Sequence, residues 1–194
     1  YSKEKVVKIG ITQIVTHPSL DLARKGFIDA LKEADYVEGK NVKYDLKNAH
    51  GDMATAQTIA KTFVDSKVDL IFSIATPTSQ AVVKATPKIP IVYAAVTDPV
   101  ASGLVKSMQS SGNNVTGVSD MWPIEDQIKL FLKLVPSVKK MGIIYNPGET
   151  NSLIIVDMAE KACQKVKVEL VKATVSNSNE VFTAAQSLVG RVDA

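Results

Sequence analysis

The sequence has few of the residues from which most metal and catalytic sites are built. Its 194 residues include one cysteine, Cys163, and two histidines, His17 and His50. A single cysteine excludes a disulfide within the chain and any metal site made of several cysteines. The two histidines lack the spacing of a zinc-binding helix, so we expect no metal. Cys163 lies at helical spacing from other apolar residues, and we interpret it as a core residue.

Long apolar runs, an excess of one charge and glycine-rich phosphate motifs are also missing. The longest apolar runs, Val68 to Ala75 and Ile89 to Val96, are much shorter than the ~18–20 residues of a membrane span. Lys and Arg total 23 against 20 Asp and Glu, spread along the chain, which argues against nucleic acid as a partner. Gly10 stands alone, without a dinucleotide or P-loop motif, and there is no GxSxG. We therefore expect no cofactor and no serine nucleophile elbow.

Short apolar runs alternate with amphipathic stretches along the whole chain, and 45% of the residues are hydrophobic. Strand-like runs that alternate with helical periodicity are typical of parallel strands joined by right-handed crossovers. The sequence therefore predicts an open α/β sheet flanked by helices. The expected strands of the first half are Val6–Gln13, Asn41–Asn48, Val68–Ala75, Ile89–Val96 and Asn114–Ser119. The expected helices are Ser19–Ala34, one capped by Asp52, and one that Thr76 caps and Pro77 opens.

The pattern starts again near residue 120, which predicts a second α/β lobe. Val192-Asp193-Ala194 echoes Val68-Asp69-Leu70, the start of the third strand in the first half. We therefore expect an N-terminal lobe at 1–119, a partial C-terminal lobe at 120–194, and a longer parent protein. The elements expected in the second half are Pro123–Leu134, Lys139–Asn146, Thr150–Val166, Val168–Val175 and Asn179–Gly190.

Polar loops at the ends of the predicted strands are the candidate functional sites. Ligands of open α/β sheets bind at the carboxyl ends of the strands, where helix N-termini offer free N–H groups. Thr76, Thr78 and Ser79 suit a carboxylate or another small anion, although such residues also serve as simple helix caps. Asp98 and Asp120 could hold an ammonium group, although Asp98 before a proline is also an ordinary turn residue.

Two further residues could take part in such a site. Trp122, the only tryptophan, could stack on a ligand ring or pack at the junction of the two halves. His17 could line a cleft or cap its own loop. The loops are polar but carry no recognisable catalytic set, and this pattern favours binding over turnover.

At these same loops the sequence resembles the substrate-binding proteins of ABC importers, in the branch associated with tryptophan and tyrosine uptake. The resemblance implies a type I periplasmic-binding-protein fold, in which two lobes close on a small ligand. Members of this family are longer than 194 residues. The stretches that carry the resemblance are Gln13–Asp21 with Gly26-Phe27, Ala75–Ala81, Ile89–Val100, Gly117–Asp120 and Gly142–Ser152.

The resemblance implies a ligand, a set of contacts and a partner. The ligand is expected to be an aromatic amino acid, with its carboxylate near the hydroxyls of Thr76, Thr78 and Ser79 and its ammonium at Asp120. The partner would be a membrane permease, and the protein would be extracytoplasmic, either periplasmic or lipid-anchored. The implied ligand-binding residues are Thr16, His17, Thr76, Thr78, Ser79, Thr97, Asp98, Asp120, Asn146, Glu149 and Asn151.

Two alternatives to an importer component stay open at this point. A two-lobed α/β enzyme acting on a small carboxylate would show turnover or a catalytic pair converging in the cleft. The effector-binding lobe of a transcriptional regulator would have a DNA-binding helix-turn-helix ahead of residue 1. A signal peptide with a lipid-modified cysteine at that place would instead favour the binding protein.

Overall fold

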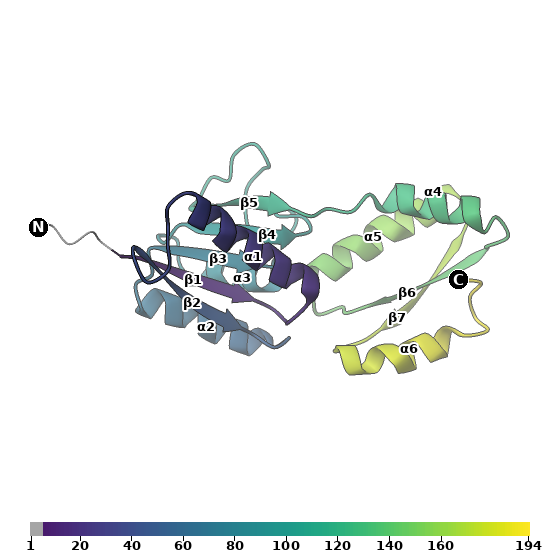
Figure 1. Cartoon of the computed structure of the whole chain (residues 1–194). Helices are drawn as coiled ribbons and strands as arrows, with labels where there is room; N and C mark the ends of the chain where they lie inside the picture. Colours follow the sequence, from purple (N-terminus) through teal and green to yellow (C-terminus); the bar gives the residue numbers. More distant parts are fainter. Residues whose placement is uncertain (1–5) are drawn as a thin grey trace, which may run out of the picture. The chain divides into compact units, whose positions relative to one another are not determined.

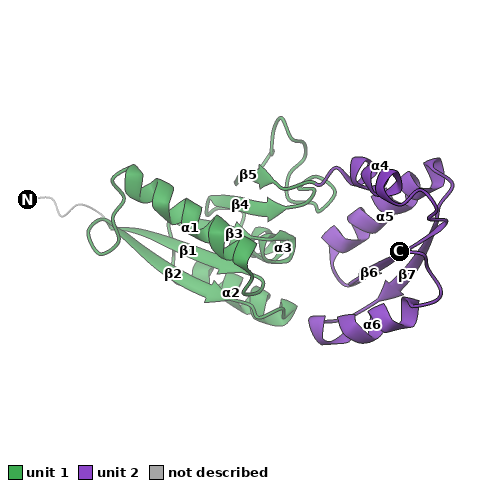
Figure 2. Ribbon diagram, turned by 45° about the vertical axis from the view of Figure 1, so that its right-hand side comes forward, with its two compact units in different colours: residues 1–121 green, residues 122–194 purple. Residues whose placement is uncertain are grey.

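The computed structural model describes residues 6–194, and these divide into two compact units, one ending at Met121 and one running from Trp122 to Ala194 (Figure 2). In both units parallel strands form the sheet and helices cover it. The predicted α/β class is therefore confirmed. None of the helices within residues 6–194 is both long and apolar enough to cross a bilayer.

Unit 1 is a five-stranded parallel sheet in the order β2-β1-β3-β4-β5 (Figure 1). Because the strands are parallel, the carboxyl ends of β1, β3 and β4 lie side by side at one edge. Its elements are β1 (Val7–Gln13), α1 (Pro18–Glu33), β2 (Val42–Asn48), α2 (Met53–Asp65), β3 (Leu70–Ile74), α3 (Thr76–Ala85), β4 (Ile91–Val96) and β5 (Val115–Ser119).

Two apolar clusters fix the helices of unit 1 to opposite faces of the sheet. On one face the ring of Phe27 in α1 stacks on Phe72 in β3, with ring centroids 4.0 Å apart. On the other face Phe63 of α2 packs directly on Gly10 of β1, where an added Cβ would lie 2.8 Å from the ring. Gly10 is therefore required for the packing of α2 on the sheet.

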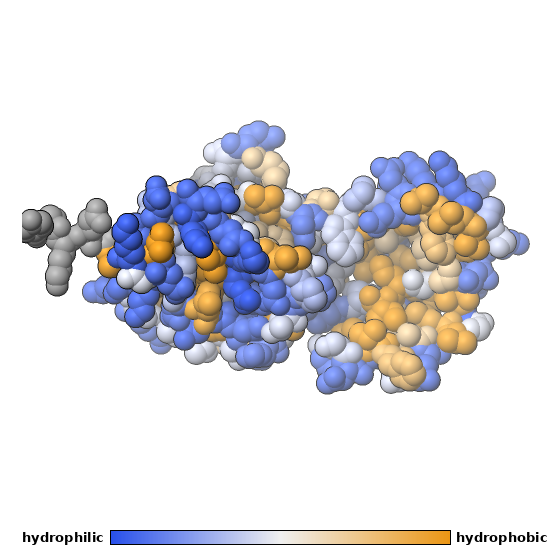
Figure 3. Space-filling view, viewed as in Figure 1, coloured by the Kyte–Doolittle hydropathy of each residue, from blue (hydrophilic) through white to orange (hydrophobic). Residues whose placement is uncertain are grey.

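Unit 2 pairs two parallel strands, with α4 and α5 packed against them in one apolar cluster. Apolar side chains are also visible on its surface where β6 and α6 lie (Figure 3). Phe182 and Val189 at the two ends of α6 are among the most exposed of them. The elements are α4 (Ile124–Leu134), β6 (Lys140–Tyr145), α5 (Thr150–Lys165), β7 (Glu169–Thr174), a 3-10 turn at Ser178–Glu180 and α6 (Val181–Leu188).

The sequence similarity between Val68–Leu70 and Val192–Ala194 is confirmed as a repeated pattern of hydrogen bonds. Asp69 donates its N–H to the carbonyl of Lys8 (2.7 Å) and accepts the Lys8 N–H on its carboxylate (2.9 Å). Asp193 does the same with Lys140, at 2.8 Å for each bond. The N–H of Gly142 then bonds to the carbonyl of Ala194 (2.7 Å). The last residues therefore begin to pair with β6 as the start of β3 pairs with β1.

Two local predictions of the sequence are wrong in detail. Asn179–Gly190 is not one helix, because a 3-10 turn precedes α6. Asn177 Oδ1 accepts the N–H of Asn179 and Glu180 accepts the N–H of Ser176, and these bonds hold the turn. Thr76 does not cap α3, since the cap position falls on Ala75 and no side chain bonds there. The predicted cap at Asp52 is confirmed, because its Oδ1 accepts the Thr55 N–H at 2.6 Å.

Candidate functional site

The carboxyl edge of the unit 1 sheet gathers most of the residues that the sequence singled out. The β1–α1 loop carries Thr16 and His17, and β3 leads directly into the Thr76–Ser79 turn of α3. The loops that follow β4 and β5 carry Thr97, Asp98 and Asp120. The strand order β1-β3-β4-β5 makes these loops neighbours at one edge. Asn146, Glu149 and Asn151 form a separate group in unit 2.

The junction between β3 and α3 is a single residue, Ala75. Its backbone lies at φ 82° and ψ 155°, a region that glycine occupies almost alone. Ala95, near the end of the neighbouring β4, also has a positive φ of 54°, and the pairing of β4 with β5 shifts register there. The N–H of Ala75 bonds to the carbonyl of Ala94 (3.0 Å), so the two strained segments are joined. Such strain persists only where surrounding structure enforces it.

The first turn of α3 presents unused hydrogen-bond donors at this edge. The side chain of Thr76 is 2% exposed, and its buried Oγ1 has no partner within residues 6–194. Pro77 has no N–H, and the N–H of Ser79 bonds to the carbonyl of Ala75. The N–H groups of Thr76 and Thr78 have no backbone acceptor in the described chain. The first turn of α3 therefore holds a buried hydroxyl without a partner and two N–H groups without a backbone acceptor among the described residues.

The other two hydroxyls of the loop are already committed to the backbone. Thr78 donates to the carbonyl of Ile74 at 2.6 Å, and Ser79 donates to that of Ala75 at 2.9 Å. Ser79 Oγ also lies 2.8 Å from Ser73 Oγ. Because a hydroxyl has one proton, neither of these donors is free for an anion. Thr78 and Ser79 therefore hold the strained junction in place, and Thr76 carries the open donor.

The two predicted acids of unit 1 have different surroundings. Asp98 accepts the N–H groups of Val100 and Ala101, each at 2.9 Å, which is the geometry of a turn. Asp120 has no bonded cation in the described part of the chain. Desolvation raises the pKa of the Asp120 carboxyl above its ordinary value. Asp120 is exposed to solvent, so a cationic group of a ligand can reach its carboxylate.

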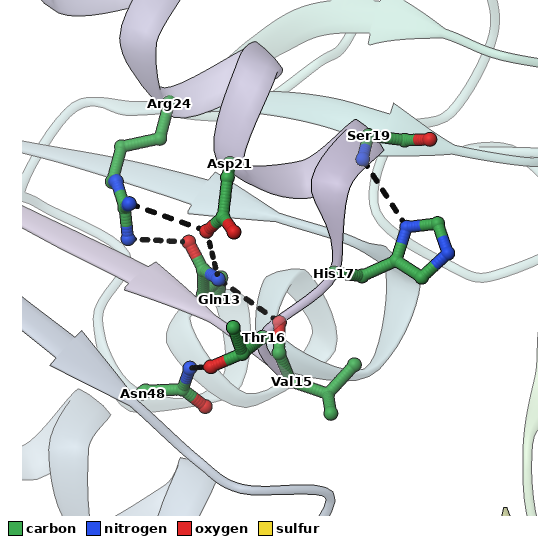
Figure 4. A network of polar contacts seen from close by, with 8 residues as sticks. All are labelled: Gln13, Val15, Thr16, His17, Ser19, Asp21, Arg24 and Asn48. Atoms are coloured by element: carbon green, nitrogen blue, oxygen red, sulfur yellow. Dashed lines mark hydrogen bonds and ion pairs between the residues drawn. The ribbon is translucent and has the colours of Figure 1, made fainter.

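The loop after β1 is held by hydrogen bonds from side chains that were not among the predicted site residues. His17 caps α1, because its Nδ1 accepts the Ser19 N–H at 3.2 Å, and Asn48 donates to Thr16 Oγ1 at 2.9 Å (Figure 4). Beneath them lies Gln13, which is 1% exposed and bonded to Asp21 and Arg24. A glutamine at the end of a strand that carries Ile9 and Ile11 on the same face was the available signal for this network.

The group in unit 2 is built around one carboxylate. Asn146 and Asn151 each donate a side-chain N–H to Glu149, to different oxygens, at 3.3 Å. Asn151 Oδ1 is buried and has no partner among the described residues. The group lies between the carboxyl end of β6 and the start of α5, the place that corresponds to the α1 loop in unit 1. The structure thus brings these three predicted residues together.

Neither unit offers a metal centre within the described residues. No group of three or more His, Cys, Asp or Glu side chains lies close enough to hold an ion in residues 6–194. Cys163 is buried, which raises the pKa of its thiol and agrees with a core position. What the edge of unit 1 offers is a set of hydrogen-bond donors and one free carboxylate, and this set matches a small charged ligand.

Comparison with known proteins identifies the family of this chain. The ABC transporter substrate binding protein family matches residues 8–194, and the chain belongs to this family. A relative from Clostridioides difficile strain R20291, named tyrosine-binding protein, is 49% identical over 190 residues. That match covers 98% of this chain and 55% of the relative, so the chain spans about half of the relative's length.

Solved structures support the same family and the fold. A Streptococcus pneumoniae ABC domain in complex with L-Trp is 38% identical, with a TM-score of 0.92, over 97% of this chain and 64% of that one. A conserved domain protein from Vibrio cholerae is 44% identical, with a TM-score of 0.95 and the same coverage. A leucine-binding protein from Thermotoga maritima is 19% identical with a TM-score of 0.72, and it covers 96% of this chain and 53% of that one. The predicted type I periplasmic-binding-protein fold is confirmed.

We predict that Ala75→Gly stabilises the protein. Relief of about 1–3 kcal/mol of backbone strain exceeds the about 0.5–1 kcal/mol that glycine costs through the unfolded chain. The free energy of unfolding, measured by urea titration, should rise by about 1 kcal/mol. Ala30→Gly, on the exposed face of α1, is the control and should lower it by about 1 kcal/mol. A loss of stability in Ala75→Gly equal to that of the control would contradict the strain.

Proposed function

We propose that this protein is the solute-binding component of an ABC importer and that it captures an aromatic amino acid such as tryptophan or tyrosine. Membership of the substrate-binding family supports the role. The ligand class is supported by the 49% identical relative named tyrosine-binding protein and by the pneumococcal structure with L-Trp. In this role the protein binds and delivers its ligand, and it is not an enzyme.

The open donors at the start of α3 are the observation that carries the proposal. Leaving a buried hydroxyl without a partner costs about 1–3 kcal/mol, and Thr76 Oγ1 is such a group. A ligand carboxylate would accept this hydroxyl together with the N–H groups of Thr76 and Thr78. The helix N-terminus adds a favourable interaction with negative charge. A carboxylate also fits because it only accepts hydrogen bonds, and all three groups donate.

The ammonium of the amino acid requires acceptors, and Asp120 is our first choice. Asp120 is exposed, and no cation pairs with its carboxylate in the described part of the chain. Glu149, held by Asn146 and Asn151, is a second acidic group of the right kind. Thr16, His17, Thr97 and Asp98 remain proposed contacts at the edge of unit 1. Thr78 remains in the proposed set through its backbone N–H, and both Thr78 and Ser79 remain in it through their support of the loop.

The proposed role implies a partner and a location. A solute-binding component delivers its ligand to a permease in the membrane, so we propose a permease as the protein partner. The protein would then act outside the cytoplasmic membrane, either free in the periplasm or held at the surface by a lipid. The family membership supports this location.

Thermal unfolding with a ligand panel tests the proposal. In the protein at its natural full length, L-tryptophan, L-tyrosine or L-phenylalanine at a thousand times its Kd should stabilise the fold by about 4 kcal/mol, a shift of several degrees. Tryptamine, which lacks the carboxylate, should give little or no shift, and so should sugars and nucleosides. The absence of a shift with every amino acid of the panel would refute the proposal.

We predict that Thr76→Val weakens ligand binding without weakening the fold. Valine has a similar shape but no hydroxyl, so a ligand carboxylate would lose one donor, worth about tenfold in Kd. The ligand-free protein loses only an unpaired buried group, so its midpoint of unfolding should be unchanged or higher. Calorimetric titration gives the Kd. Thr62→Val in α2, where the hydroxyl donates to the carbonyl of Thr58, is the matched control and should leave Kd unchanged.

We predict that affinity falls in acid and that Asp120→Asn removes much of this dependence. An ammonium binds the ionised carboxylate, so affinity should rise with pH through the raised pKa of Asp120 and then level off. The asparagine variant should bind roughly 10–100-fold more weakly at neutral pH. Because a raised pKa means that ionised Asp120 destabilises the ligand-free fold, the variant should also unfold at slightly higher temperature at neutral pH. Unchanged Kd values across the pH range would exclude Asp120 as the ammonium partner.

A further inference from the structure

The buried carboxamide of Gln13 lies beneath the loop that carries Thr16 and His17 (Figure 4). Gln13 is the last residue of β1, on the side of the sheet that α1 covers, and it is 1% exposed. Its Nε2 donates to the carbonyl of Val15 at 2.9 Å and to Asp21 Oδ1 at 3.0 Å. Its Oε1 accepts from Arg24 Nη1 at 3.0 Å. Both amide protons and one acceptor position are therefore used.

The network closes on itself through an ion pair. Arg24 Nη2 lies 3.2 Å from Asp21 Oδ1, so one guanidinium contacts both the amide and the carboxylate. Asp21 lies in the first turn of α1 and Arg24 one turn further on. The end of β1, the start of α1 and the loop between them are thus joined through the buried amide of Gln13.

The backbone of the loop is fixed at three consecutive carbonyls. The carbonyl of Gln13 accepts the N–H of Ala49 at 3.0 Å, and that of Ile14 accepts the N–H of Gly51 at 2.7 Å. The carbonyl of Val15 is the third, and its acceptor bond comes from the Gln13 side chain. Beyond these residues, Thr16 and His17 are exposed to solvent. The carbonyl of His17 accepts the N–H of Asp21 at 2.9 Å, so the bond from Gln13 to Val15 fixes the part of the loop directly before Thr16.

We propose that Gln13, together with Asp21 and Arg24, is the positioning device that presents Thr16 and His17 to the ligand. This inference rests on the proposed function. Gln13 itself lies under the loop and acts through it, so it is a positioning residue. A loop held in its binding geometry before the ligand arrives loses less conformational entropy on binding. Ligand affinity therefore depends on a buried group that makes no contact with the ligand.

The cap at His17 supplies a readout of this positioning. Because Nδ1 accepts the Ser19 N–H, the imidazole proton must reside on Nε2. The nitrogen shifts of the His17 ring therefore report whether the loop keeps its geometry. A residue that merely stabilises the fold would leave this tautomer unchanged.

The test uses Gln13→Glu in the protein at its natural full length. Glutamate has the same shape, but it sets an oxygen against the carbonyl of Val15 and the carboxylate of Asp21. Losing these buried bonds should raise the Kd for L-tryptophan by about tenfold and mix the two His17 tautomers. Ile59→Val in the core of α2 is the control for a loss of stability alone, and it should change neither readout.

Arg24→Lys is the milder companion variant, because Arg24 is partly exposed and lysine keeps the charge but cannot bridge both partners. It should fold well and give a smaller rise in Kd, with the same direction of change at His17. The proposal is overturned if both variants bind with the wild-type Kd, or if His17 keeps its tautomer while only stability falls. A wild-type protein that binds no aromatic amino acid refutes the proposed function instead, and the His17 spectra still decide the positioning.

Discussion

The single-residue junction between β3 and α3 is the constraint on which the candidate site depends. Only Ala75 separates the last residue of the strand from the first of the helix, so the chain must reverse within one residue. The positive φ of Ala75 achieves this, and the hydroxyls of Thr78 and Ser79 hold it by bonding to Ile74 and Ala75. The same geometry leaves the donors of Thr76 without partners at the sheet edge. The backbone strain at Ala75 and the unpartnered donors of Thr76 thus both follow from the one-residue junction.

Other loops of the two units are also held by hydrogen bonds from buried or half-buried polar side chains. Gln13 fixes the loop after β1, and Ser119 fixes the loop after β4 by donating to the carbonyl of Thr97 at 2.8 Å. In unit 2 two asparagine amides hold the carboxylate of Glu149. Buried amides and hydroxyls are costly when they lack partners, so such networks also make the position of each loop unique. A binding protein benefits because its ligand meets preformed loops.

The sequence predicted the fold well because periodicity and strand-helix alternation are local signals. The parallel pairing of the strands, the Asp52 cap and the Asp69–Asp193 repeat are all confirmed. Local signals also placed the candidate residues at the ends of strands. Because the strands are parallel, these ends lie along one edge of the sheet.

The local sequence could not assign the hydrogen bonds of these residues. Thr76, Thr78 and Ser79 look equivalent in the sequence, yet only Thr76 keeps a hydroxyl without a partner. Which hydroxyl can reach a backbone carbonyl depends on the conformation of Ala75. Gln13 was missed for a similar reason. Its partners Asp21 and Arg24 come from the following helix, and their convergence needs the packing of α1 on the sheet.

The amide NMR signals of Thr76 and Thr78 during titration with L-tryptophan test the central claim most directly. A carboxylate that accepts these N–H groups should move both amide protons downfield, while tryptamine should leave both in place. Large shifts elsewhere on the protein without a change at Thr76 and Thr78 would contradict the account, because the ligand would then bind away from the start of α3.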